Sequence, residues 1–82
     1  MPDASAVALQ VLGWVLSDSQ RAERLLALTG LTPDALRAGL GDPGVLGAVL
    51  DFLANHEADL VAAAEALDIS PETIISAREN LT

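Results

Sequence analysis

Hydrophobic residues recur along this chain at the spacing of α-helices. Across residues 4–16 the apolar side chains cover well over half of a helical circumference, and only Gln10, Gly13 and Ser17 leave a narrow polar stripe. A helix that is apolar over so much of its surface belongs in the centre of a bundle. Residues 43–54 are similarly apolar, and no segment alternates convincingly at a period of two. The pattern therefore predicts an all-α fold.

The interruptions of the apolar pattern carry the residues that end or begin helices. Gly30 sits where a helix ends in the left-handed conformation. Thr32 and Ser70 each provide a hydroxyl N-cap, and Pro33 and Pro71 follow them at the first helical position. We interpret these four residues as structural caps. With the other breaks, they predict a compact bundle of five to six short helices.

Two further helix starts depend on shorter polar segments. Ser17 stands three residues before Gln20, the spacing of a capping box, although Asp18 or Ser19 could equally cap this helix. Asn55 is expected to cap the helix that follows the second long apolar segment.

The chain repeats its pattern at an offset of 38 residues. Pro33 and Pro71 are 71 − 33 = 38 positions apart, and the same shift places Trp14 on Phe52, which are the only aromatic residues. It also places "LTPDAL" on "ISPETI". Shared capping chemistry would explain the matching prolines but not the matching aromatic residues.

Two interpretations of this repeat stay open. The single domain of residues 1–82 consists either of two related three-helix halves, about 4–41 and 42–82, or of helical hairpins that share only their caps. Two related halves would most simply pack their long helices against each other.

Composition and charge narrow the range of functions. The formal net charge is −8, and all four basic residues are arginines. Nucleic-acid phosphates and anionic membranes repel such a chain. The apolar run near the N-terminus is broken by Gln10 and Gly13 and ends at Leu16, far short of the about 20 residues that a bilayer requires. We expect a soluble, cytoplasmic protein that binds neither nucleic acid nor a membrane.

Residues 62–74, "AAAEALDISPETI", resemble the corner of a DNA-binding helix-turn-helix. The signal is weak, because any tight corner between two helices needs the same small and capping residues. The helix that follows presents Glu72 and Glu79, and Arg78 is its only cation. A recognition helix must instead offer donors to bases and phosphates. We interpret this motif as architecture.

The chain offers no recognisable catalytic, cofactor or metal site. It has no cysteine, and its single histidine, His56, has only Glu57 and Asp59 near it on one helical turn. Metal sites need three or four ligands. We therefore expect no enzyme activity, no cofactor and a solvated His56 near a helix cap.

Trp14 and Phe52 are weak candidates for an interface, because aromatic residues are enriched at binding hot spots. Their helical phase favours core packing. The first helix is so apolar that a strip of it could stay exposed, which leaves a protein partner or a homo-oligomer open.

The segments "ALQVLGWVLSD" and "LLALTGLTPDALRAGLGDPGVLGAVLDFLANHEADLV" resemble a family of small, uncharacterised, all-helical alphaproteobacterial proteins, a domain of unknown function. The resemblance implies a compact helical domain and assigns no site. The leading hypothesis is therefore a non-enzymatic protein-interaction or regulatory module. The alternatives are a helix-turn-helix-like DNA-binding regulator and a small-molecule binder between the two halves.

Overall fold

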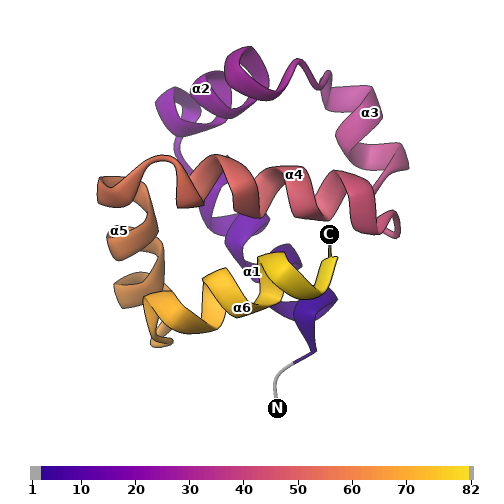
Figure 1. Cartoon of the computed structure of the whole chain (residues 1–82). Coiled ribbons are helices and arrows are strands. Elements are labelled where there is room, and N and C mark those ends of the chain that lie inside the picture. Colours follow the sequence, from indigo (N-terminus) through magenta and orange to yellow (C-terminus); the bar gives the residue numbers. More distant parts are fainter. Residues whose placement is uncertain (1–2, 82) are drawn as a thin grey trace.

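The computed structural model describes residues 3–81, and within this range the chain forms six helices and no strand (Figure 1). The outer limits predicted for the domain, residues 1 and 82, lie outside the described residues. The all-α prediction is confirmed. The helices are α1 (Ala4–Leu16), α2 (Ser19–Thr29), α3 (Pro33–Ala38), α4 (Pro43–Ala54), α5 (Glu57–Leu67) and α6 (Pro71–Leu81).

The two long apolar helices, α1 and α4, pack against each other at the centre of the bundle, and α6 lies against both (Figure 1). α2 contacts α1 and α4, whereas α5 contacts α1, α4 and α6. Every fully buried side chain among the described residues is apolar. The largest are Val11, Val15, Leu25, Leu46, Val49, Leu50, Leu53 and Ile74.

Capping side chains begin most of the helices. Asp18 accepts a hydrogen bond from the Gln20 amide at 3.1 Å and so caps α2. Thr32 accepts from the Ala35 amide at 3.0 Å, directly before Pro33. Ser70 accepts from the amide of Thr73 at 3.2 Å, directly before Pro71. These bonds satisfy amides that have no partner inside the helix.

The prediction that Asn55 caps α5 is wrong. Asn55 instead ends α4, where its side-chain amide donates to the carbonyl of Asp51 at 3.0 Å. His56 is the N-cap residue of α5, and it makes no capping hydrogen bond with its side chain. The acidic side chains of Glu57 and Asp59 face the positive end of this helix dipole.

The second helix of each half has the same limits at the 38-residue offset, and the first helices, α1 and α4, share their end but differ by one residue at their start. α5 begins and ends 38 positions after α2 (57 − 19 and 67 − 29). Both helices end at a left-handed residue, Gly30 with φ 75° and Asp68 with φ 56°. A non-glycine residue rarely adopts this conformation, and Asp tolerates it better than most.

The third helices differ. α3 has six residues and α6 has eleven. In the described chain, α6 packs along three other helices, whereas α3 packs extensively on none and lies at the edge of the molecule (Figure 1). Leu36 and Gly39 hold α3 to the bundle. Leu36 is buried, and a Cβ at Gly39 would lie 2.6 Å from Cγ2 of Val45, so only glycine allows this close approach to α4.

Candidate functional site

The short α3 leaves an apolar groove between itself, α1 and α2. We call it the α1–α3 groove. Its volume is about 360 Å³. It is lined by Leu12, Leu16, Ala22, Leu26, Pro33, Leu36, Arg37 and Leu40.

The floor of the groove is buried and its rim is exposed. Leu12 and Leu36 are only 3% and 5% exposed, and they form the floor. Leu16 and Leu40 form the rim, with exposed fractions of 47% and 41%. Leu9 is also exposed and precedes Leu12 and Leu16 at helical spacing, so the apolar strip of α1 continues beyond the groove.

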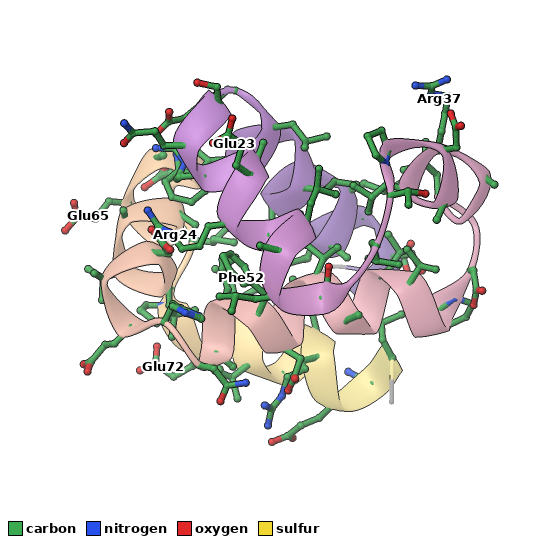
Figure 2. All side chains as sticks on the ribbon, turned by 90° about the horizontal axis from the view of Figure 1, so that it is seen from above. Glu23, Arg24, Arg37, Phe52, Glu65 and Glu72 are labelled. Atoms are coloured by element: carbon green, nitrogen blue, oxygen red, sulfur yellow. The ribbon has the colours of Figure 1, made fainter. Side chains whose placement is uncertain are left out.

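Arg37 is the charged residue of the groove lining. Its guanidinium lies 3.5 Å from a carboxylate oxygen of Asp34, and both side chains are strongly exposed. Ion pairs this exposed contribute little to stability, because water screens them. Figure 2 shows Arg37 projecting from the edge of the molecule. Its side chain is therefore available to a ligand or a partner.

The surface of the molecule as a whole is acidic. Each of the four arginines forms an ion pair with an aspartate, at Arg21–Asp18, Arg24–Asp59, Arg37–Asp34 and Arg78–Asp51. The five glutamates are all exposed, and Figure 2 shows Glu23, Glu65 and Glu72 pointing outward. With a formal net charge of −8, this surface repels phosphate groups and attracts cations.

Trp14 and Phe52 both lie outside the groove. Phe52 is buried, and its ring centroid lies 4.7 Å from that of His56. Nδ1 of His56 lies 2.8 Å from the carbonyl oxygen of Phe52, which fixes the half-buried imidazole at the end of α4. His56 is thus packed rather than fully solvated.

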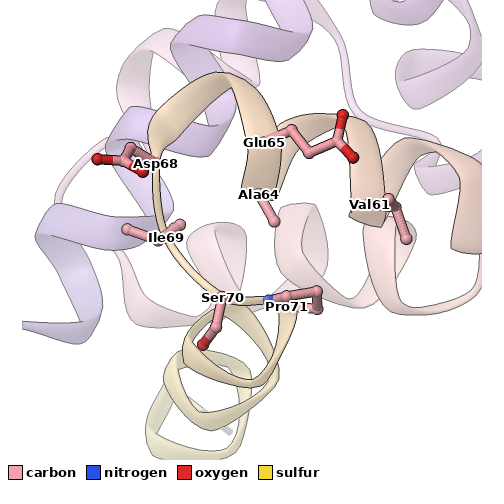
Figure 3. Close-up of a pocket in the computed structure, with 7 residues that line it drawn as sticks. All are labelled: Val61, Ala64, Glu65, Asp68, Ile69, Ser70 and Pro71. Atoms are coloured by element: carbon pink, nitrogen blue, oxygen red, sulfur yellow. The ribbon is translucent and has the colours of Figure 1, made fainter.

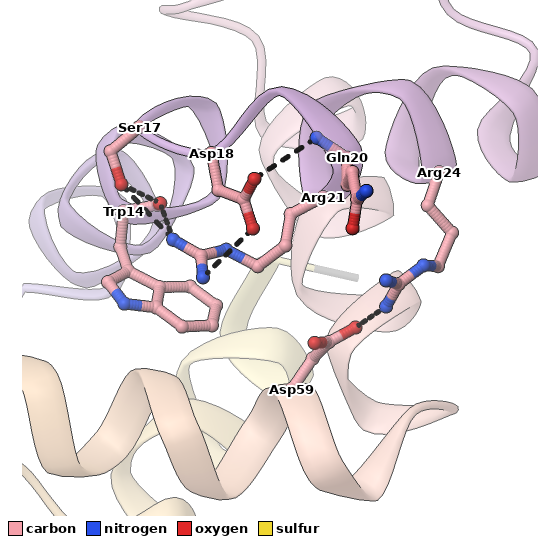
Figure 4. A network of polar contacts seen from close by, with 7 residues as sticks. All are labelled: Trp14, Ser17, Asp18, Gln20, Arg21, Arg24 and Asp59. Atoms are coloured by element: carbon pink, nitrogen blue, oxygen red, sulfur yellow. Dashed lines mark hydrogen bonds and ion pairs between the residues drawn. The ribbon is translucent and has the colours of Figure 1, made fainter.

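Trp14 belongs to a polar network at the α1–α2 turn (Figure 4). The guanidinium carbon of Arg21 lies 3.8 Å from the centroid of the indole ring, a cation–π contact. Nη2 of Arg21 also donates to the carbonyl of Trp14 at 2.9 Å and to Oγ of Ser17 at 3.1 Å. These contacts give Trp14 a structural role in holding the turn.

The α5–α6 corner carries a second, more polar cavity of about 520 Å³ (Figure 3). We call it the corner pocket. It is lined by Val61, Ala64, Glu65, Asp68, Ile69, Ser70 and Pro71. Glu65 and Asp68 bring two carboxylates to it, so a phosphate-bearing ligand would be repelled there.

The helix after this corner is packed into the bundle. α6 packs against α1 and α4, where Ile74 and Ala77 are buried. Arg78 lies 3.1 Å from a carboxylate oxygen of Asp51. Glu72 and Glu79 are exposed on the same helix. No observation on α6 favours binding to bases or phosphates.

Residues 3–81 contain neither a metal-binding cluster of side chains nor a helix suited to span a membrane. No group of three or more His, Asp or Glu side chains there is arranged to hold a metal ion. None of the helices in this range is both long and apolar enough to cross a bilayer.

Sequence reasoning missed the α1–α3 groove. The sequence did indicate an apolar strip on the first helix and a helix that begins at Pro33. The sequence does not indicate how far α3 lies from α1, because that distance depends on tertiary packing. α6 has eleven residues and α3 has six, and this difference in helix length indicates a surface that α3 leaves uncovered.

Comparison with known proteins gives one family. Neither the search of curated proteins nor the search of solved structures found a match. Residues 2–82 match the family described as "Protein of unknown function (DUF3572)". This match confirms the resemblance to a domain of unknown function, and the alphaproteobacterial source stays a prediction. Because the match spans nearly the whole sequence, the chain belongs to the DUF3572 family of proteins of unknown function.

Proposed function

We propose that this protein is a non-enzymatic protein-interaction or regulatory module of the cytoplasm, and that the α1–α3 groove is its docking surface. The observation that carries the proposal is the pair of exposed rim leucines, Leu16 and Leu40, above a buried leucine floor. Contiguous exposed apolar surface with a polar border is typical of protein-interaction sites.

The energetics of the rim support docking. Full burial of a leucine side chain is worth about 1.5–3 kcal/mol. Leu16 and Leu40 are roughly half exposed, so covering them contributes about 1 kcal/mol each. The floor residues Leu12 and Leu36 are already desolvated, and a partner gains contacts with them without removing much water.

Capture with matched variants tests this proposal. The groove variant carries Leu16→Gln and Leu40→Gln. The control variant carries Leu28→Gln and Val61→Gln, which lie outside the groove and have comparable exposure (60% and 40%). Glutamine is neutral and a good helix former, so it adds polarity with little cost to the helix.

The protein is immobilised at equal density in all three forms and exposed to lysate of the native host. We expect proteins that bind the unaltered protein and the control variant to be lost from the groove variant. Retention on the groove variant, with loss from the control variant, would move the site to the α2 or α5 surface. Absence of any protein enriched over a charge-matched acidic control would contradict the interaction function.

A second function is favoured by the volume of the groove and by Arg37. Pockets for small ligands have volumes of about 300–1,000 Å³ and combine apolar walls with few polar groups. The α1–α3 groove, at about 360 Å³, fits a small apolar carboxylate held by Arg37. This pocket lies within the first half, at residues 12–40, rather than between the halves.

Thermal-shift measurements with medium-chain fatty acids test this alternative. Stabilisation that Arg37→Gln abolishes, and that primary alcohols of equal chain length do not reproduce, would support an anion-binding groove. A flat response over the whole series would contradict it, because a ligand that binds the folded state must raise its stability.

A further inference from the structure

We infer that the α1–α3 groove binds a short, basic amphipathic helix of a partner protein. This inference rests on the proposed interaction function and adds the chemistry of the partner. It is supported by the shape of the groove, by the packing of α6 in the second half, and by the net charge of the chain.

The shape of the groove fits a helix. Two of its walls are the helices α1 and α2, and exposed apolar residues at Leu9 and Leu16 follow one face of α1. A groove between helices is filled by another amphipathic helix, which inserts apolar side chains at positions i, i+3 or i+4, and i+7. Such anchors would pass between the rim leucines and rest on Leu12 and Leu36.

The second half has a longer third helix, which does cover apolar surface of its neighbours. There α6, with eleven residues, lies across α1 and α4 and buries Ile74 and Ala77 (Figure 1). α3 begins at the corresponding position but ends after six residues. The missing five residues amount to about 7 Å of helix, at about 1.5 Å per residue. A partner helix would supply the cover that α3 does not.

The formal net charge of the chain, −8, favours a basic helix. Glu23 follows Ala22 of the lining on α2, Asp34 follows Pro33 on α3, and both are exposed. The cation of the lining, Arg37, already has Asp34 at 3.5 Å. Lysine and arginine side chains on the outer face of a docked helix would meet this acidic border.

The same charge argues against two other occupants. A second copy of the chain also carries a formal net charge of −8, so like charges meet when two copies approach. An anionic bilayer repels the acidic border in the same way.

Peptide selection tests the inference. A display library of peptides of about 12 residues, roughly three helical turns, is selected on the unaltered protein and counter-selected on the groove variant. We expect enrichment of peptides with aliphatic residues at i, i+4 and i+7 and with Lys or Arg on the remaining face. Circular dichroism of an enriched peptide should show helix formation on binding.

Calorimetry with an enriched peptide then measures the binding affinity of each variant. The groove variant should bind about 30-fold more weakly, whereas the control variant should bind within about twofold of the unaltered protein. Raising the salt concentration should weaken binding, because the charge contacts lie at an exposed rim.

Several results would overturn the inference. Enrichment of acidic or extended peptides, equal binding to the groove variant, or no groove-dependent peptide would each contradict it. Self-association lost in the groove variant, or groove-dependent binding to phosphatidylglycerol vesicles, would assign the surface to another occupant.

The two proposals can fail separately. If lysate partners depend on Leu16 and Leu40 but their binding segment is not a basic helix, the interaction function stands and the stated chemistry is wrong. If neither lysate proteins nor peptides depend on these leucines, both proposals are wrong.

Discussion

The α2–α3 corner and the α5–α6 corner begin from nearly the same sequence pattern and reach different structures. Each has a helix that ends at a left-handed residue, then a hydroxyl cap, a proline and an acid. After that point α6 continues across the centre of the bundle, whereas α3 stops at Ala38 and leaves a groove beside it. Shared caps therefore determine where a helix starts, and the length of apolar surface after the cap determines whether it docks.

The largest expected difference between the corners is at their buried aliphatic anchors, Ile74 in α6 and Leu36 in α3. We expect Ile74→Ala to lower the free energy of unfolding by about 3 kcal/mol, because it leaves a cavity inside the core. Leu36→Ala should cost about 2 kcal/mol, because Leu36 borders an open groove and its surroundings can relax. Urea unfolding followed by circular dichroism measures both values. An equal or larger loss at Leu36 would show that α3 is held as tightly as α6.

A smaller effect is expected where α3 meets α4. Gly39→Ala should lower the free energy of unfolding by about 2 kcal/mol, because the added Cβ would overlap Val45. The corresponding residue in α6, Ala77, is buried and already carries a Cβ. Gly13→Ala is the matched control: nothing lies within 4 Å of its added Cβ, and it should raise stability by about 1 kcal/mol. Tolerance of Gly39→Ala would contradict the close approach of α3 to α4.

Substitutions of the two hydroxyl caps should distinguish a loss of stability of the whole bundle from a local loss in α3. Ser70→Ala should lower the free energy of unfolding by about 1 kcal/mol, because α6 is part of the core. Thr32→Ala should cost about 0.5 kcal/mol globally, because α3 can fray without unfolding the bundle. Hydrogen exchange should then show faster exchange confined to the amides of α3. Equal global losses for both variants would remove the distinction between the corners.

The smallest effect is expected at the two left-handed residues. Asp68→Gly should raise the free energy of unfolding by about 0.5 kcal/mol, because glycine adopts φ 56° without a steric cost. Gly30→Asp should lower it by a similar amount, about 0.5 kcal/mol, at φ 75°. Thermal unfolding of the pair measures both changes. Changes of the same sign would contradict the shared geometry of the two corners.

Local chemistry allowed the helices to be predicted from the sequence. Gly30, Thr32 and Pro33 define one boundary through contacts only a few residues apart, so their spacing is enough. The prediction that Asn55 caps α5 was wrong because an asparagine side chain can cap either end of a helix. In the structure its side-chain amide donates to the carbonyl of Asp51, one turn earlier in α4, and Asn55 therefore ends that helix.

The candidate site could not be predicted in the same way. Leu16 and Leu40 look like ordinary bundle residues in the sequence, and their exposure follows from how far α3 stands from α1. Such a distance depends on how separate helices pack, as in the close approach of Gly39 to Val45 of α4 and the packing of the long α6 across α1. Spacing along the chain does not contain that information.

The guanidinium of Arg21 over the indole of Trp14 has a consequence for spectroscopy. Trp14 is the single tryptophan of the chain, so the intrinsic fluorescence reports on the α1–α2 turn. Loss of this stacking on unfolding would change the emission. Because Trp14 does not line the α1–α3 groove, the emission should stay nearly constant when a ligand occupies the groove. The chain therefore carries an internal fluorophore that follows denaturation separately from ligand occupancy.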